Sequence, residues 1–348
     1  MVASKRYKVE KKLGEGAFAT VFKAWDSERS TWVAVKYLKG ELLRESSNLE
    51  RLRREFAACK KISHPNVIEI FDMQIAPSSA FLVMEYLSCP SLEDLLSKGP
   101  LDWKRAKHYA VALSEALFEI HQGGLVHRDI KPGNILVQGQ RPVLMDFNLV
   151  FDAQVTALTK TGQIVGTPSY MAPEAIFDGK STFKSDIYGL GVLLWEMLSA
   201  EEPYGDINSF AELIRTARSR KLPSLVELNR QIPRLQAEAF DGVVARATAF
   251  EQEERYQSAK EMALELEGIK EGSTAKEGST AKEGSTAKEG KVAKGGAGKG
   301  PRPGKISPSS QSRKKDTSSG AYEASSLPGA VQGKTSDPQS AAARDSSR

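Results

Sequence analysis

The sequence has 348 residues, of which 40% are hydrophobic and 27% are charged, and its formal net charge is +5. Such a chain can bury one large core or two smaller ones, and its only two cysteines, Cys59 and Cys89, exclude a disulfide-stapled fold. We therefore expect a soluble protein of a reducing compartment, the cytoplasm. The charged segment Met1–Glu10 indicates no signal peptide. The most apolar run, Ile187–Leu198, is shorter than the roughly 20 residues of a membrane span and predicts a buried helix.

The first elements predict a sheet that can bind phosphate. Tyr7–Lys12 has the pattern of a strand, and a Gly-x-Gly turn at residues 14–16 leads into a second apolar stretch. Glycines let backbone amides approach phosphate closely, although a plain glycine hairpin between two strands is the alternative. Trp32–Leu38 alternates as a strand, which places Ala34 and Lys36 on one face. A lysine beside a small alanine can lie over a ligand.

The next segment, Glu41–Ile62, predicts an amphipathic helix. Apolar side chains recur along it at spacings of three and four, and they are Leu49, Leu52, Phe56 and Cys59. Glu55 lies on the same face. Its carboxylate either extends to solvent or pairs with Lys36, and this segment alone favours neither alternative.

The chemical centre of the chain lies in two motifs. Residues 127–134 read His-Arg-Asp-Ile-Lys-Pro-Gly-Asn, and residues 146–148 read Asp-Phe-Asn. Asp129, Asn134 and Asp146 offer one base and two metal-binding side chains, which phosphoryl transfer from a metal-bound nucleotide requires. The sequence between the motifs predicts a hairpin of two short strands, at 135–137 and 143–145. Such a hairpin would bring the two metal-binding side chains together.

In their order and number, these motifs resemble those of the eukaryotic-type serine/threonine protein kinases, most closely the bacterial members. The likeness spans residues 7–268 and includes Gly166–Glu174, Asp186 in an apolar helix, and Arg255. It implies an α+β, two-lobed protein-kinase fold. A small antiparallel sheet with one helix would form the N-lobe (about 7–87), and a mostly helical C-lobe (about 91–268) would follow, with ATP bound between them.

The resemblance also implies chemical roles. Asp129 would accept or orient the proton of the substrate hydroxyl, and Lys131 would neutralise the transferring phosphoryl group, as in serine/threonine-specific members. Asn134 and Asp146 would hold Mg²⁺, with Mn²⁺ as a substitute. Lys36 would grip the ATP phosphates and be held by Glu55. The expected ATP-binding residues are Leu13, Gly14, Glu15, Gly16, Ala17, Phe18, Ala19, Val21, Ala34, Lys36, Met84, Glu85, Leu87 and Leu136.

Other motif residues are expected to support the site without reacting. They are His127, Arg128, Phe147, Asn148, Thr167, Glu174, Asp186 and Arg255. In the family, an arginine at the position of Arg128 commonly pairs with a phosphorylated residue of the segment after Asp146. Thr159 and Thr161 match positions that are modified in similar bacterial kinases, and we expect autophosphorylation at one or both.

Two positions depart from the family pattern. Ala19 replaces the third glycine of the phosphate loop, and Asn148 replaces the glycine of Asp-Phe-Gly. Asparagine tolerates positive φ better than most residues, so we expect Asp146 still to reach metal. The departures nevertheless motivate one alternative, a nucleotide-binding pseudokinase scaffold. A small-molecule kinase of related fold is disfavoured by Lys131 and by the peptide-docking motif Gly166–Glu174.

The C-terminal part of the chain, residues 269–348, predicts a disordered tail. Glu-Gly-Ser-Thr-Ala-Lys repeats three times from Glu271 to Lys288, with almost no bulky apolar residue to stack. From Lys270 onward there are 15 Lys and Arg against 8 Asp and Glu, so the basicity of the chain belongs to this segment. A solubilising tail is the simplest interpretation, and weak contact with polyanions is the alternative. Expected partners are protein substrates with serine or threonine acceptors.

Overall fold

The computed structural model describes residues 5–16, 19–38, 46–76, 79–147, 168–205, 212, 215–216 and 221–270. All of them belong to one compact unit, Met1–Ala275. Some of the predictions above lie outside the described residues. These concern Ala17, Phe18, Asn148, Thr159, Thr161, Thr167 and the chain beyond residue 270.

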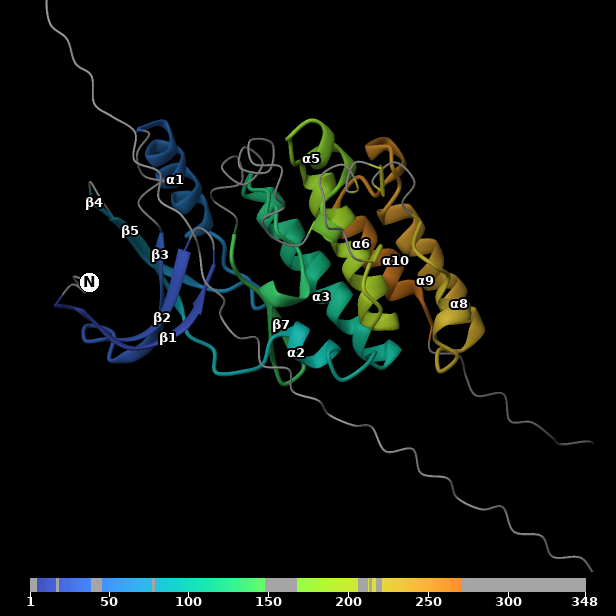
Figure 1. The fold of residues 1–348 in the computed structure, drawn as a ribbon, viewed down its shortest axis with the longest axis horizontal. Helices are drawn as coiled ribbons and strands as arrows, with labels where there is room; N and C mark the ends of the chain where they lie inside the picture. The colour runs from blue at the N-terminus through green and yellow to red at the C-terminus, as the bar shows by residue number, and fades with distance from the viewer. Residues whose placement is uncertain are drawn as a thin grey trace, which may run out of the picture. The chain divides into compact units, whose positions relative to one another are not determined.

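The N-terminal part is a five-stranded antiparallel sheet of order β1-β2-β3-β5-β4 (Figure 1). Its strands are β1 (Tyr7–Glu15), β2 (Ala19–Asp26), β3 (Thr31–Leu38), β4 (Ile70–Ala76) and β5 (Ser79–Glu85). The predicted strands at Tyr7–Lys12 and Trp32–Leu38 are confirmed; the first is three residues longer than predicted and the second is one residue longer. In the register, Lys36 lies opposite Val21 of β2 and Leu82 of β5, while Ala34 lies opposite Met84.

Alternation along β3 separates two environments, because successive side chains of a strand point to opposite faces. Val33 and Val35 pack with Phe81 in a small apolar cluster on one face. Ala34, on the other face, joins the main core of the protein together with Met84. Lys36 follows Ala34 on that second face, where the sheet meets the functional cavity described below.

Helix α1 (Ser46–Cys59) is the one helix that precedes β4 among the described residues. It is shorter than the predicted segment Glu41–Ile62, whose residues 41–45 lie outside the described part. Leu52 and Cys59 are buried, as the apolar spacing predicted. Burial raises the pKa of the Cys59 thiol to about 12, so this cysteine is an uncharged core residue.

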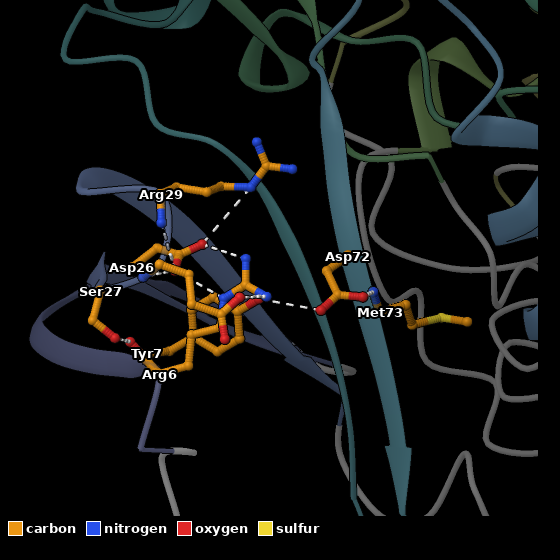
Figure 2. A network of polar contacts seen from close by, with 8 residues as sticks. Arg6, Tyr7, Asp26, Ser27, Arg29, Asp72 and Met73 are labelled. Carbon is orange, nitrogen blue, oxygen red and sulfur yellow. Dashed lines mark hydrogen bonds and ion pairs between the residues drawn. The ribbon is translucent and has the colours of Figure 1, made fainter.

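A network of polar contacts stabilises the β1–β2 edge of the sheet (Figure 2). The Asp26 carboxylate is fully buried at the end of β2 and accepts two 2.8 Å hydrogen bonds from the Arg6 guanidinium. It also accepts backbone hydrogen bonds from Glu28 and Arg29, so the start of the β2–β3 turn is held as well. The hydrogen bond from Arg6 is the main reason why the pKa of Asp26 lies below its usual value. This network stabilises the β1–β2 edge, away from the cavity.

The second part of the unit is mostly helical. Its elements are α2 (Leu92–Leu96), α3 (Trp103–Gln122), η2 (Pro132–Asn134), β6 (Ile135–Gln138), β7 (Arg141–Leu144), η3 (Pro168–Tyr170), α5 (Pro173–Phe177), α6 (Phe183–Ser199), α8 (Leu225–Leu228), α9 (Arg234–Ala247), η4 (Gln252–Glu254) and α10 (Ala259–Gly268). Two of the helices begin with a side-chain cap: Ser91 and Asp94 form a capping box at α2, and Asp102 caps α3.

Helix α6 is the centre of this helical part, with α3 on one side and α9 on the other (Figure 1). It contains the apolar run Ile187–Leu198, and its side chains are almost all buried, which confirms the prediction of a buried helix. Helix α9 approaches so closely that a Cβ added at Gly191 would lie 2.6 Å from the Ala247 Cβ. Only glycine at this position permits that approach.

Two buried polar anchors connect loops to α6. Arg255 donates 2.8 Å hydrogen bonds to both carboxylate oxygens of Glu174, and Ser185 donates to the same carboxylate. Asp186, near the start of α6, accepts hydrogen bonds from the backbone amides of His127 and Arg128, each at 2.8 Å. The second anchor holds the start of the loop that carries Asp129.

Candidate active site

A cavity of about 710 Å³ lies between the glycine turn, the sheet and the loops of the helical part. It contains every predicted ATP-binding residue that the structure describes, and also the four polar residues of the two motifs. The former are Leu13, Gly14, Glu15, Gly16, Ala19, Val21, Ala34, Lys36, Met84, Glu85, Leu87 and Leu136, and the latter are Asp129, Lys131, Asn134 and Asp146. Residues 123 positions apart in the sequence, Leu13 and Leu136, thus line one cavity.

The cavity includes residues that the sequence did not reveal. Its lining includes Cys89, three residues before α2, and Asp94 within α2. Its apolar lining also includes Leu52 of α1, Met73 of β4 and Phe81 of β5. Apolar residues of strands and helices carry no sequence signal that separates a cavity wall from an ordinary core position, so only the fold could place them.

The loop at residues 127–134 is held by its own side chains. Lys131 Nζ lies 2.9 Å from Asp129 Oδ2, and Asn134 Nδ2 donates to the same oxygen at 2.7 Å and to the Asp129 carbonyl at 2.8 Å. The Asp129 carboxylate is therefore positioned by one cation and one amide. It remains partly accessible from the cavity, with a side-chain exposure of 30%.

The hairpin of β6 and β7 brings the two motifs together, as predicted. The Met145 amide donates to the Asn134 carbonyl at 2.9 Å, which places Asp146 directly beside the end of the first motif. The turn is tighter than expected, because Gln138 pairs with Arg141 and Gly139 takes a positive φ of 66°. Asp146 itself has a φ of 62°, a backbone conformation uncommon for residues other than glycine.

The oxygen atoms of Asn134 and Asp146 suit a hard divalent cation. Since Asn134 Nδ2 donates to Asp129, its amide oxygen is the atom left to bind a ligand. No group of three or more His, Cys, Asp or Glu side chains that could hold a metal occurs among the described residues. A cation at Asn134 and Asp146 would therefore need further oxygen ligands, and nucleotide phosphates supply them.

The buried side chain of His127 stabilises the arrangement of the two motifs. Its ring is fully buried, packs against Phe147 with 5.1 Å between ring centroids, and lies 3.0 Å from the Met145 carbonyl through Nε2. Burial lowers the pKa of His127, so the ring is neutral at physiological pH. A buried neutral ring has no access to a reacting group, which agrees with the expected structural role.

The predicted pairing of Lys36 with Glu55 is wrong in this structure. Lys36 Nζ lies 3.1 Å from Asp146 Oδ1, and Glu55 Oε1 lies 2.9 Å from Arg128 Nη1. The physical reason is that two cationic side chains and two carboxylates lie in the same part of the fold; they are Lys36, Arg128, Glu55 and Asp146. The guanidinium of Arg128 reaches α1 and takes the carboxylate of Glu55, so the nearest anion for Lys36 is Asp146.

A further carboxylate with unusual properties lies on α6. Glu196 accepts a 2.5 Å hydrogen bond from the Tyr170 hydroxyl. Burial, with a smaller contribution from the negative charges of Glu93 and Glu202, raises the pKa of Glu196 to about 7. Tyr170 belongs to the Gly166–Glu174 motif that the sequence associated with peptide docking.

Comparison with known proteins agrees with the geometry of the site. Residues 7–265 match the sequence model of the protein kinase domain. The serine/threonine-protein kinase PrkC of Bacillus subtilis is 30% identical over 265 residues, which cover 76% of this chain and 40% of PrkC. The serine/threonine-protein kinase PknB of Mycobacterium tuberculosis is 32% identical over 278 residues, which cover 77% of this chain and 44% of PknB.

Solved structures show the same fold. The kinase domain of Mycobacterium tuberculosis PknI superposes with a TM-score of 0.61 at 23% identity, covering 77% of this chain and 98% of that domain. The match to PrkC and PknB spans less than half the length of those relatives. In the part of the chain that the structure describes, no helix has the length and apolar character needed to span a bilayer. The chain belongs to the protein kinase family and has the two-lobed fold of its catalytic domain.

Proposed function

We propose that this protein is a serine/threonine protein kinase, which transfers the γ-phosphate of ATP to hydroxyl groups of proteins, including its own. The observation that carries the proposal is the convergence of Lys36, Asp129, Lys131, Asn134 and Asp146 in one cavity beside the glycine turn. The family uses ATP with a divalent metal and acts on proteins. Mg²⁺ is the cation that the oxygen ligands of Asn134 and Asp146 favour, with Mn²⁺ as a substitute.

The positions of the side chains support a division of labour. Asp129 accepts the proton of the substrate hydroxyl while the oxygen of that hydroxyl attacks the γ-phosphorus of ATP. The bond between this phosphorus and the oxygen of the leaving ADP breaks as the new bond forms. Lys131, 2.9 Å from Asp129, stabilises the charge of the group in transit. Lys36 binds nucleotide phosphate, and Asn134 and Asp146 hold the cation. When bound, that cation offsets charge on the phosphates.

The choice of acceptor follows from Lys131. A lysine two residues after the catalytic aspartate is typical of the serine/threonine-specific members of the family, and both relatives named above are serine/threonine-protein kinases. The comparisons give no support to the pseudokinase alternative. We propose boundaries of 7–268 for the kinase domain, with lobes at about 7–87 and 91–268, since α2 is capped by Ser91.

The test is transfer of radiolabel from ATP to a generic protein acceptor. Wild type should label itself and the acceptor, and Asp129→Asn should lose at least about 10³-fold in rate. Asp102→Asn is the matched control, because Asp102 is an exposed helix cap that asparagine replaces well. Equal labelling by wild type and Asp129→Asn would overturn the mechanism, and no labelling by either would favour the scaffold.

Regulatory phosphorylation of Thr159 and Thr161 is part of the same proposal. Both lie outside the described residues, so their support is the sequence resemblance together with Arg128, which lies beside the site. Mass spectrometry after incubation with MgATP should find phosphate on at least one of them in wild type and on neither in Asp129→Asn. An unmodified wild-type protein would contradict this part of the proposal.

A further inference from the structure

The chain leaves the helical part at a point that side chains hold in place. Lys107 Nζ of α3 donates to the Ile269 carbonyl at 2.7 Å, and Gln236 Nε2 of α9 donates to the Lys270 carbonyl at 2.9 Å. The side chain of Ile269 is also buried. The repeats begin at the next residue, so the number of residues between this exit and each repeat is known.

Helix α10 carries the chain toward the N-terminal half of α3. Near the start of α10, Lys260 pairs with Glu115 of α3 at 3.1 Å, and just after its end Ile269 accepts the hydrogen bond from Lys107. Residue numbers on α3 fall as those on α10 rise, so the two helices run in opposite directions. The exit therefore lies beside Lys107, near the beginning of α3.

The opposite end of α3 holds the catalytic loop. His121 Nε2 lies 2.9 Å from Asp186, and the Asp186 carboxylate accepts the backbone amide of Arg128 at 2.8 Å. At a rise of about 1.5 Å per residue, Lys107 and His121 are about 21 Å apart along α3. Asp129 directly follows Arg128, so it lies on the order of 20 Å from the exit of the chain.

The repeats place hydroxyl groups at regular intervals from this exit. Each of the three copies contains one Ser-Thr pair, at residues 273–274, 279–280 and 285–286, whereas the degenerate copy at 289–294 has Lys-Val in that place. A chain spans at most about 3.6 Å per residue, so the three pairs can lie no farther than about 14, 36 and 58 Å from Lys270. The first pair is therefore too close to the exit to reach Asp129 of its own molecule, and the other two are not.

Proximity along the chain also favours the second and third pairs over hydroxyls farther on. The effective concentration of a tethered group falls roughly as the −3/2 power of tether length once the tether can span the distance. The pairs at 279–280 and 285–286 are the first hydroxyls beyond the exit that satisfy this condition. Glycine and alanine flank each pair, so no bulky neighbour hinders entry of the hydroxyl into the site.

We propose that the kinase phosphorylates the Ser-Thr pairs at 279–280 and 285–286 of its own chain within one molecule, and that the pair at 273–274 is spared. The inference rests on the proposed kinase function and names an acceptor for it. In each transfer the hydroxyl oxygen bonds to the γ-phosphorus of ATP, ADP leaves, and Asp129 takes the hydroxyl proton. One phosphate on each pair lowers the charge of the basic segment from Lys270 onward by about 3–4 units.

The test is a time course of the full chain with MgATP, in which mass spectrometry measures the occupancy of each pair. At about 1 µM protein the second and third pairs should be modified at least about tenfold faster than the first, because tethering supplies an effective concentration of about 1 mM. Dilution should leave these two rates unchanged. Equal modification of all three pairs, at rates that rise with protein concentration, would overturn the proposal.

A change of repeat number separates reach from local sequence. Deletion of residues 271–276 moves the second pair to the position of the first without altering its own copy, so modification of 279–280 should fall at least about tenfold while that of 285–286 persists. Insertion of one extra copy after Lys270 should conversely expose the pair at 273–274 to modification. Unchanged occupancies in both variants would refute the reach argument.

Two controls distinguish this proposal from the proposed function. Asp129→Asn protein mixed with dilute wild type should stay unmodified at all three pairs, and its modification would show transfer between molecules and contradict the proposal. Wild type that labels a generic protein acceptor but neither 279–280 nor 285–286 would refute the inference alone. Wild type that labels no acceptor would refute the kinase function and the inference together.

Discussion

The buried ion pair between Glu174 and Arg255 allows a quantitative test of the energetics of the fold. The Arg255 side chain is fully buried, and its Nη1 and Nη2 each lie 2.8 Å from a Glu174 oxygen. Its other donors reach the carbonyls of Ala249, Lys184 and Phe250. Arg255→Met therefore leaves a buried carboxylate and three carbonyls without this partner.

The expected magnitude follows from burial. Removing one partner of a buried ion pair destabilises a protein by about 3–5 kcal/mol, because the remaining charge stays uncompensated. In a domain of this size each 1 kcal/mol lowers the melting temperature by about 2–4 °C. We expect Arg255→Met to lower the melting temperature by roughly 10 °C, measured by calorimetry at neutral pH.

A second pair provides the matched control. Arg234 Nε also lies 2.8 Å from a glutamate, Glu238, but the two side chains are 81% and 50% exposed. Exposed pairs contribute about 0–1 kcal/mol, so Arg234→Met should shift the melting temperature by no more than about 4 °C. Adding Glu174→Leu to Arg255→Met should recover part of the loss, since no buried charge remains. Equal shifts for the two arginine variants would refute the reasoning.

Three further predictions concern single positions. Since the pKa of Glu196 is raised from 4.5 to about 7, the folded state binds its proton more tightly, and stability falls as pH rises through that window. Chemical unfolding at pH 4.5 and 7.5 should show that the free energy of unfolding falls by up to about 3 kcal/mol less in Glu196→Gln than in the wild type. An equal fall in both proteins would contradict the raised pKa of Glu196. Gly191→Ala should destabilise by about 1–3 kcal/mol in the same assay, and Ala247→Gly should restore part of it, because the two Cβ atoms would lie 2.6 Å apart. Asn148→Gly should change the transfer rate by less than about tenfold, and a gain of several orders of magnitude would show that asparagine disables the wild type.

Local patterns in the sequence predicted the elements that carry the site. Alternation along β3 placed Lys36 and Ala34 on one face, and the spacing in α1 placed Leu52 and Cys59 in the core. Strand signals around residues 138–142 predicted the hairpin that joins Asn134 to Asp146. Each of these features depends on residues only a few positions apart. The periodicity of side-chain directions along a strand or helix therefore determines them.

The resemblance of the sequence motifs to those of protein kinases predicted which residues line the cavity. Every described residue expected to bind ATP lines it, although no periodicity connects Leu13 with Leu136. The apolar lining residues Leu52, Met73 and Phe81 carried no such sequence signal. Whether an apolar side chain faces a cavity or a neighbour depends on how far two elements approach, and that distance is absent from local sequence.

The partners of the charged groups were decided only by the tertiary structure. The resemblance of the sequence motifs to those of the family implied that Lys36, Glu55, Arg128 and Asp146 belong to one site, and it implied the pair Lys36–Glu55. The structure instead pairs Lys36 with Asp146 and Glu55 with Arg128. Coulombic attraction depends on the separation of charges in space, and a small displacement of α1 against the loop at Arg128 changes which opposite charge is nearest. The sequence by itself determined which charges meet, and the packing of α1 determined how they pair.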